Sequence, residues 1–156
     1  MADTSLNENR LGLLIWQTAN FWQSKLRKIL KEFSISLNEY LILEAIFKLE
    51  KINLNISQIT ITQNTSIDVT VVSAKLYFLK NKKYIKRTIG INNRSKKINL
   101  TEKGSKLVKI LINAIENEEK LFFNKLNQET FNLINSLKLL LGKKIRIKAS
   151  YNEYNK

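Results

Sequence analysis

The chain has 156 residues, 44% of them hydrophobic, and a formal net charge of +14, so it is long enough to fold as one domain around one core. It contains no cysteine, no histidine and only two aspartates, so a disulfide, a thiolate nucleophile, a catalytic triad and a conventional metal site lack their parts, and we expect neither enzymatic activity nor a cofactor. No signal-peptide pattern and no long apolar stretch occurs, which predicts a cytoplasmic protein that does not enter a membrane.

The positive charge is concentrated in the middle third of the chain. Residues 1–50 carry six basic and six acidic side chains, residues 51–100 carry ten basic against one acidic, and residues 101–156 carry eleven against six. The abundance of Lys, Ile and Asn is also what an AT-rich genome produces, but codon usage would act along the whole chain. A local concentration of charge therefore predicts a surface for a polyanion such as nucleic acid.

Two amphipathic helices are predicted in the first third of the chain. Mostly apolar side chains recur at steps of three and four residues between positions 11 and 33, which is the period of one helix face. That stripe consists of Leu11, Ile15, Thr18, Trp22, Leu26, Ile29 and Phe33. Ser36 and Glu39 have the spacing of a capping box, so a second helix is expected to start there and to reach about Leu49.

Residues 55–80 are predicted to form two helices joined by a short turn. The first helix is expected over Ile56 to Gln63 with Asn55 as its N-cap, and Asn64 to Ser66 has the composition of a polar turn. Asp68 is a strong N-cap for a second helix that extends to about Lys80. The expected inner face of that helix consists of Val72, Leu76 and Leu79. Its outer face is small and polar at the N-terminal end, which is typical of a helix that contacts DNA bases.

Two short strands and two further helices follow. Residues 84–89 and 96–100 are β-branched or alternating segments on either side of residues 90–95, which are rich in turn formers, and together they predict a basic hairpin. Residues 101–104 are expected to cap a long helix that carries Leu107, Ile110, Leu111, Ala114, Leu121 and Phe122. Residues 127–129 are expected to cap a last helix, which Gly142 can end and which carries Phe131, Ile134, Leu137 and Leu141.

The segment from Asn92 to Gly104 resembles the wing and the following helix start of the MarR family of bacterial transcription regulators. The family pattern is Asp-x-Arg, a spacer and Leu-Thr-x-x-Gly; this chain has Asn92-Asn93-Arg94 and then Leu100-Thr101-Glu102-Lys103-Gly104. The order of elements from about Leu11 to Leu141 is also similar. The resemblance implies a mainly α fold with a small β wing. It further implies a single MarR-like unit over residues 1–156, with dimerisation helices at about 7–35 and 102–142 and a winged helix-turn-helix region at about 36–101.

The chain departs from the family pattern at two positions. Asn92 stands where the family usually has Asp, so an ion pair with Arg94 inside the wing cannot form. Lys83 stands where the family usually has a Gly after the recognition helix. A left-handed residue there would be Lys83 itself, or the turn would shift to Asn81.

The resemblance implies a homodimer that binds a palindromic DNA operator and regulates transcription. The expected base contacts in the major groove come from Thr70, Val71, Ser73 and Ala74. The expected phosphate and minor-groove contacts come from Arg87, Arg94, Lys96 and Lys97. The alternative for the base-contact residues is an ordinary solvated helix face, and the alternative for the lysines is surface charge that results from codon usage. The alternative to the homodimer is a monomeric helical bundle that is closed by the apolar stripes of the first and last helices.

Small phenolic or amphipathic effectors bind, in that family, in a cleft bordered by helices equivalent to the first two predicted here. The resemblance implies an effector pocket lined by Trp16, Phe21, Tyr40 and Phe47, although aromatic residues at helical spacing are more commonly core residues. The alternative to a regulator is a basic protein that binds nucleoid DNA or RNA without sequence preference and without a ligand. The hairpin lacks the aromatic pair on adjacent strands that single-strand binding uses, which favours duplex DNA.

Overall fold

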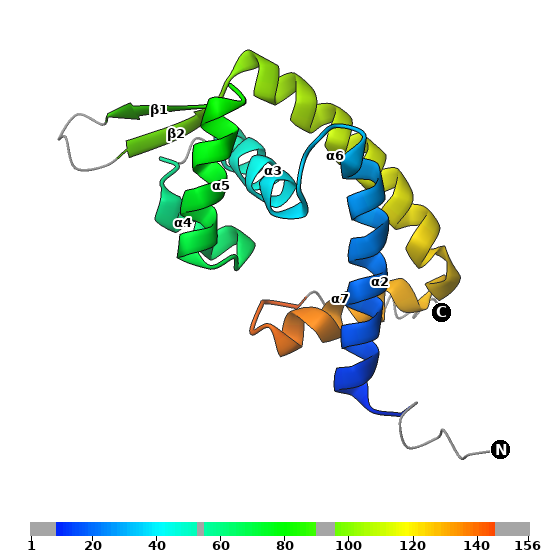
Figure 1. Cartoon of the computed structure of the whole chain (residues 1–156). Coiled ribbons are helices and arrows are strands. Elements are labelled where there is room, and N and C mark those ends of the chain that lie inside the picture. Colours follow the sequence, from blue (N-terminus) through cyan, green and yellow to red (C-terminus); the bar gives the residue numbers. More distant parts are fainter. Residues whose placement is uncertain (1–8, 53–54, 90–95, 146–156) are drawn as a thin grey trace, which may run out of the picture. The chain divides into compact units, whose positions relative to one another are not determined.

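A computed structural model of the chain describes residues 9–52, 55–89 and 96–145, and Figure 1 shows how its elements follow one another. The helices before the hairpin are α2 (Leu11–Lys31), α3 (Leu37–Lys51), α4 (Gln58–Thr65) and α5 (Val69–Asn81). The remaining elements are β1 (Ile85–Ile89), β2 (Lys96–Leu100), α6 (Glu102–Phe123), a short 3-10 helix (Asn124–Leu126) and α7 (Glu129–Leu140). This composition confirms the predicted fold class, mainly α with a small β wing.

The helices predicted in the first third form at the expected positions. Helix α2 buries Leu26 and Leu30 in its C-terminal half, whereas Leu11 at its start is exposed. At the start of α3, Ser36 Oγ accepts the backbone N–H of Glu39 at 3.2 Å, and Glu39 Oε2 accepts the backbone N–H of Ser36 at 3.2 Å. These bonds satisfy amide donors that a first helical turn leaves without partners, so the predicted capping box is confirmed.

Helix α4 begins two residues later than predicted, so both the expected bounds, Ile56 to Gln63, and the expected N-cap, Asn55, are wrong. The N-cap is Ser57, whose Oγ accepts the backbone N–H of Thr60 at 3.2 Å. The helix starts late because the carbonyl oxygen of Ile56 accepts the backbone N–H of Ile98 in β2 at 2.9 Å, and the side chain of Ile56 is buried. An extended residue that pairs with the hairpin cannot also begin a helix.

The turn between α4 and α5 begins two residues later than the predicted Asn64 to Ser66. Helix α4 continues to Thr65, and its C-cap Ser66 has a left-handed φ of 57°. Asp68 then caps α5, as predicted, because its Oδ1 accepts the backbone N–H of Thr70 at 2.8 Å. The predicted inner face of α5 is also confirmed, since Val72, Leu76 and Leu79 are fully buried.

Strands β1 and β2 form an antiparallel hairpin beside α5 (Figure 1). The register pairs Ile85 with Leu100, Arg87 with Ile98 and Ile89 with Lys96. The chain leaves α5 through Lys83, which has a left-handed φ of 62°, and the backbone N–H of Tyr84 then donates to the carbonyl oxygen of Leu79 at 3.0 Å. This is a helix end that glycine usually makes, and of the two predicted alternatives the structure uses Lys83.

The start of α6 is fixed against the residues that lead into β1. Thr101 Oγ1 donates to the carbonyl oxygen of Lys83 at 2.7 Å and accepts the backbone N–H of Gly104 at 3.0 Å. The backbone N–H of Thr101 also donates to the carbonyl oxygen of Tyr84 at 3.0 Å. Gly104 is buried, and a Cβ atom at this position would lie only 1.9 Å from the oxygen of Tyr84. The Leu-Thr-x-x-Gly segment therefore allows α6 to approach the hairpin closely.

Two groups of buried side chains hold the residues before Glu119 together. The first group, the wing cluster, joins α3, α4, α5, the hairpin and the start of α6 through Ile42, Leu43, Ile46, Leu49, Ile56, Ile61, Val72, Leu76, Leu79, Ile85, Ile98, Leu100 and Val108. The second group, the α2 cluster, joins α2 to α3 and to the middle of α6 through Leu26, Leu30, Ile35, Tyr40, Leu111 and Ile115. Helix α3 contributes to both groups, so it is the central element of this part.

The described residues divide into two compact parts, one that ends at Glu118 and one that begins at Glu119. The second part contains the end of α6, the 3-10 helix and α7, and α7 buries none of its side chains. The predicted side-chain cap at residues 127–129 does not form; instead Thr130 Oγ1 donates to the carbonyl oxygen of Asn127 at 2.9 Å. Gly142 ends α7 with a φ of 67°, as predicted. The assignment of residues 7–35 and 102–142 to dimerisation stays a prediction.

Replacement of Gly104 by Ala is expected to destabilise the protein by about 3 kcal/mol or more, because the added methyl group meets a backbone oxygen that cannot move independently. Gly12→Ala is the matched control, since nothing lies within 4 Å of a Cβ atom there, and its free energy of unfolding is expected to equal that of the wild type or to rise by up to about 1 kcal/mol, because Ala favours a helix over Gly. Urea denaturation measures both values. Equal effects of the two substitutions would contradict the close approach at Tyr84.

Candidate nucleic-acid interface

Helices α4 and α5 form a helix-turn-helix whose second helix is anchored at its first turn. Gln58 Nε2 of α4 donates to the carbonyl oxygen of Val69 at 3.3 Å. The hydroxyl and the backbone N–H of Thr70 both donate to the carboxylate of Asp68, and these bonds hold the pKa of Asp68 below its ordinary value. The cap is therefore complete at neutral pH, and its contribution is lost only as the pH falls through that lowered pKa.

The outer face of α5 is free of contacts that would bury it. Thr70 and Ala74 are exposed and one turn apart, and Ser73 is exposed beside them. Val71 differs from the other predicted base-contact residues, because its side chain is half-buried at the edge of the inner face. The structure therefore brings Thr70, Ser73 and Ala74 to one surface and leaves Val71 at its border.

Tyr77 is a surface residue of this face that the sequence analysis did not select. It lies one turn after Ser73 and Ala74 on the same side of α5, and 63% of its side chain is exposed. Phe78 beside it is 47% exposed, and the two rings make an edge-to-face contact at 5.9 Å between centroids. The signal was present in the helical spacing 70, 74, 77, but an aromatic residue in a short helix is more commonly assigned to the core.

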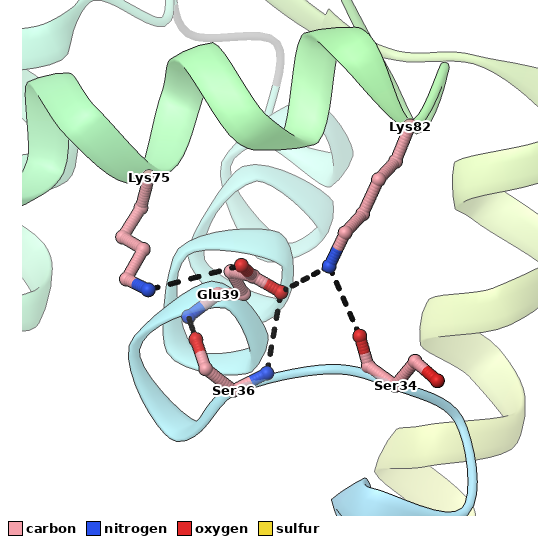
Figure 2. A network of polar contacts seen from close by, with 5 residues as sticks. All are labelled: Ser34, Ser36, Glu39, Lys75 and Lys82. Carbon is pink, nitrogen blue, oxygen red and sulfur yellow. Dashed lines mark hydrogen bonds and ion pairs between the residues drawn. The ribbon is translucent and has the colours of Figure 1, made fainter.

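A buried carboxylate connects α5 to the start of α3, as Figure 2 shows. Glu39 is 4% exposed, and its Oε2 accepts Lys82 Nζ at 2.9 Å, while its Oε1 lies 3.8 Å from Lys75 Nζ. Lys82 Nζ also donates to the carbonyl oxygen of Ser34 at 3.0 Å. Because the same carboxylate completes the capping box with Ser36, one side chain ties the N-terminus of α3 to the middle and the end of α5.

This contact changes which cations remain available to a ligand. Lys75 and Lys82 belong to the basic middle third of the sequence, but their ammonium groups face the carboxylate of Glu39. Lys80 at the end of α5 and Lys96 and Lys97 at the start of β2 are exposed. The positive surface beside the outer face of α5 is therefore smaller than the residue count predicts, and it lies at the end of α5 and on the wing.

The four cationic residues predicted to contact the DNA backbone have three different outcomes. Lys96 and Lys97 are exposed on β2, opposite Ile89 and Thr88 of β1. Arg87 is half-buried, in register with the buried Ile98. Arg94, predicted to enter the minor groove, lies outside the described residues, as does Asn92.

The residues predicted to line an effector pocket lie in three environments. Trp16 and Phe21 are exposed on α2, Tyr40 is buried in the α2 cluster, and Phe47 is half-buried against the wing cluster. A cavity of about 600 Å³ is present in the part that begins at Glu119, and none of these four residues lines it. Its apolar lining consists of Phe123, Leu126, Leu133, Ile134 and Leu137.

The part of the chain that the structure describes contains no group of three or more Asp, Glu, His or Cys side chains that could hold a metal ion. Among the described helices, none combines the length and the apolarity that are needed to cross a bilayer.

Comparisons with known proteins relate this arrangement to a class of regulators. No protein-family model and no curated protein matches the sequence. Among solved structures, MepR of S. aureus in complex with DNA is similar, at 23% identity and a TM-score of 0.77, over 87% of this chain and 97% of MepR. BpsR of Bordetella bronchiseptica, whose DNA binding is regulated by 6-hydroxynicotinic acid, is similar at 18% identity and a TM-score of 0.74, over 85% of this chain and 95% of BpsR.

A mutant MarR from E. coli is also similar, at 19% identity and a TM-score of 0.68, over 85% of this chain and 96% of MarR. The fold and the site thus define a winged helix-turn-helix protein. More specifically, the chain has the fold of MarR-family regulators.

Glu39→Gln is expected to lower the free energy of unfolding by about 1–3 kcal/mol, because it leaves Lys82 beside a neutral amide while the capping bond to Ser36 can still form. Glu44→Gln is the matched control on α3, since Glu44 pairs with the exposed Lys48 at 2.8 Å and such a pair contributes less than about 1 kcal/mol. Urea denaturation distinguishes them. If Glu39→Gln were no more destabilising than Glu44→Gln, the contact would not hold α5 in place.

Proposed function

We propose that this protein is a MarR-family transcriptional regulator, a cytoplasmic homodimer without enzymatic activity that binds a palindromic DNA operator. The observation that carries the proposal is the exposed, small and polar outer face of α5, which stands beside a hairpin with exposed lysines. The MarR-type fold supports it, because the similar MepR structure is a complex with DNA.

The shape of this surface fits the major groove of duplex DNA. The groove is about 12 Å wide and admits one helix, and side chains of small size allow the helix to approach the base edges. Ser73 can donate a hydrogen bond to a base or accept one, and Thr70, whose hydroxyl donates to Asp68, can accept one. Ala74 can contact a thymine methyl group. Tyr77 extends the same surface toward the end of α5, where the exposed Lys80 can meet a phosphate.

The wing is proposed to contact the DNA backbone next to the recognition helix. Lys96 and Lys97 are exposed at the end of the hairpin, so they can neutralise phosphates without loss of core packing. Arg94, which stands two positions before β2 in the sequence, is proposed to enter the minor groove, where the narrow geometry of AT-rich DNA favours an arginine.

The homodimer is proposed from apolar side chains that neither part of the chain buries. Leu11 and Ile15 are exposed on α2, and Ile134, Leu137 and Leu141 are exposed on or after α7. A soluble protein rarely leaves such groups in contact with water, so a second copy is the simplest cover for them. Two recognition helices in such a dimer would contact successive major grooves about 34 Å apart, which requires a palindrome.

A small aromatic or amphipathic effector is proposed as a further ligand. Trp16 and Phe21 are exposed, and the DNA binding of the similar BpsR is regulated by 6-hydroxynicotinic acid, which is such a molecule. Tyr40 and Phe47 of α3 are proposed to line the inner side of the effector site, since Tyr40 belongs to the α2 cluster and Phe47 packs against the wing cluster.

Binding to duplex DNA is expected to be strongly salt-dependent. With roughly 6–10 phosphate contacts per dimer, the affinity should fall by about 10³ or more between 50 and 200 mM salt. Fluorescence anisotropy with an operator fragment, a random duplex and a structured RNA measures this dependence and the preference together. A flat salt response would exclude DNA as the ligand, and equal affinity for all three would favour a non-specific nucleoid or RNA-binding protein.

The dimer is expected to persist at micromolar concentration. Sedimentation equilibrium should give about twice the chain mass of 18.2 kDa. Leu137→Glu places a charge on the exposed apolar face of α7, so it should shift the equilibrium to monomer, whereas Ser136→Glu, which adds the same charge at the exposed polar position beside it, tests charge alone. A wild type that sediments only as monomer would contradict the proposed homodimer.

A further inference from the structure

The outer face of α5 has almost no group that could form two hydrogen bonds with one base. Between Val69 and Phe78, Lys75 is the one residue whose side chain carries a charge or an amide, and its ammonium group lies 3.8 Å from the buried carboxylate of Glu39. Paired hydrogen bonds to guanine come from Arg or Lys, and those to adenine come from Asn or Gln. This part of α5 therefore lacks the side chains that usually recognise guanine and adenine.

The groups that this face presents instead are hydroxyl and apolar groups. Thr70 and Ser73 are exposed, but a threonine or serine hydroxyl bonds to more than one kind of base. The apolar surface comes from the exposed Ala74 and from Tyr77, whose exposed fraction is 63%. In the major groove the C5-methyl group is the apolar feature that distinguishes thymine from the other bases. An apolar helix face therefore favours thymine.

The ring of Tyr77 is supported by a series of contacts on the protein side. It meets the ring of Phe78 edge to face, with 5.9 Å between centroids and 70° between planes. Lys75 Nζ lies 5.6 Å from the centroid of the Phe78 ring and faces the carboxylate of Glu39, which Figure 2 shows. A side chain that is already supported loses less conformational freedom when it binds a ligand, so Tyr77 is suited to make a specific contact.

We propose that Tyr77 is a specificity-determining residue whose ring packs against the C5-methyl group of a thymine in the major groove, so that the operator is recognised through thymine methyl groups. The proposal rests on the proposed function, since it takes duplex DNA as the ligand. Tyr77 lies one turn after Ala74 on the same face, so the two residues can contact thymines at different positions of a half-site. Burial of one methyl group corresponds to about a fourfold gain in affinity.

The test removes the methyl group and the ring separately and together. A duplex is first selected from a random-sequence library by its binding to the wild type. Each thymidine is then replaced in turn by deoxyuridine, whose base lacks only the methyl group. For at least one position of a half-site, this replacement should weaken binding to the wild type about fourfold and leave binding to Tyr77→Ala nearly unchanged, because the methyl group no longer has a ring to contact. Fluorescence anisotropy measures the four affinities.

Two further variants separate the ring from the hydroxyl and from apolar surface in general. Tyr77→Phe keeps the ring, so it should retain both the affinity and the response to deoxyuridine. Ile52→Ala removes an apolar side chain that is also 63% exposed, at the end of α3, and it should change neither quantity. All three side chains replaced are exposed, so the thermal midpoints should stay within a few degrees of the wild type. A loss of affinity by Tyr77→Phe as large as that by Tyr77→Ala would overturn the methyl contact.

Methylated cytosine tests the same contact on the wild type in the opposite direction. A C·G pair in place of the responsive T·A pair should weaken binding. Methylation of that cytosine at C5 should then restore about fourfold of the loss, because it returns a methyl group to the same place in the groove. Equal affinity for the methylated and the unmethylated duplex would contradict the proposal.

The outcomes distinguish this inference from the proposed function. A wild type that selects a sequence but binds the deoxyuridine duplexes as tightly as the thymidine duplex would overturn this inference alone. The same conclusion would follow if deoxyuridine weakened binding to Tyr77→Ala as much as binding to the wild type. A wild type that selects no sequence, and that binds random duplex and structured RNA equally, would overturn the proposed function and this inference together.

Discussion

The position of α5 depends on the buried carboxylate of Glu39. Among the described residues, Glu39 is a charged residue that is buried. Burial of a charge is tolerated only when hydrogen bonds and opposite charges compensate the loss of hydration. Lys75 and Lys82 provide that compensation from two levels of α5, and the N–H of Ser36 provides it from the start of α3. A helix held at its middle and its end resists rotation, so the same outer face always meets solvent.

The remaining features of the site follow from how the chain distributes its few acids. Asp68 is used to cap α5 and Glu39 to hold it, so neither carboxylate lies exposed and uncommitted on the surface that would approach a nucleic acid. The exposed charges next to α5 are consequently lysines, including Lys80, Lys96 and Lys97. Gly104 packs closely against the carbonyl oxygen of Tyr84, and the backbone N–H of Thr101 donates to the same oxygen. These contacts between the start of α6 and the residue before β1 keep the hairpin beside that surface.

Local chemistry was predictable from the sequence, whereas contacts between distant segments were not. Capping rules predict the capping box of Ser36 and Glu39 and the N-cap Asp68, and helical period predicts the buried face of α5. The sequence also limits the left-handed residue after α5 to Lys83 or Asn81. The start of α4 was mispredicted because Ile56 is engaged by Ile98, which lies 42 positions later in the sequence. Likewise the pairing of Glu39 with Lys82, and the inward side of Arg87, depend on how α3, α5 and the hairpin pack together.

Hydroxyl-radical footprinting of the exposed aromatic side chains tests the central claim, that the outer face of α5 is the surface that contacts a duplex, most directly. Tyr77 on α5 and Trp16 on α2 are exposed to similar extents, 63% and 67%, so each reports on its own surface in one sample. Addition of a duplex should strongly reduce the oxidation of Tyr77 and leave that of Trp16 unchanged. Equal oxidation of Tyr77 with and without bound duplex would show that another surface of the protein holds the nucleic acid.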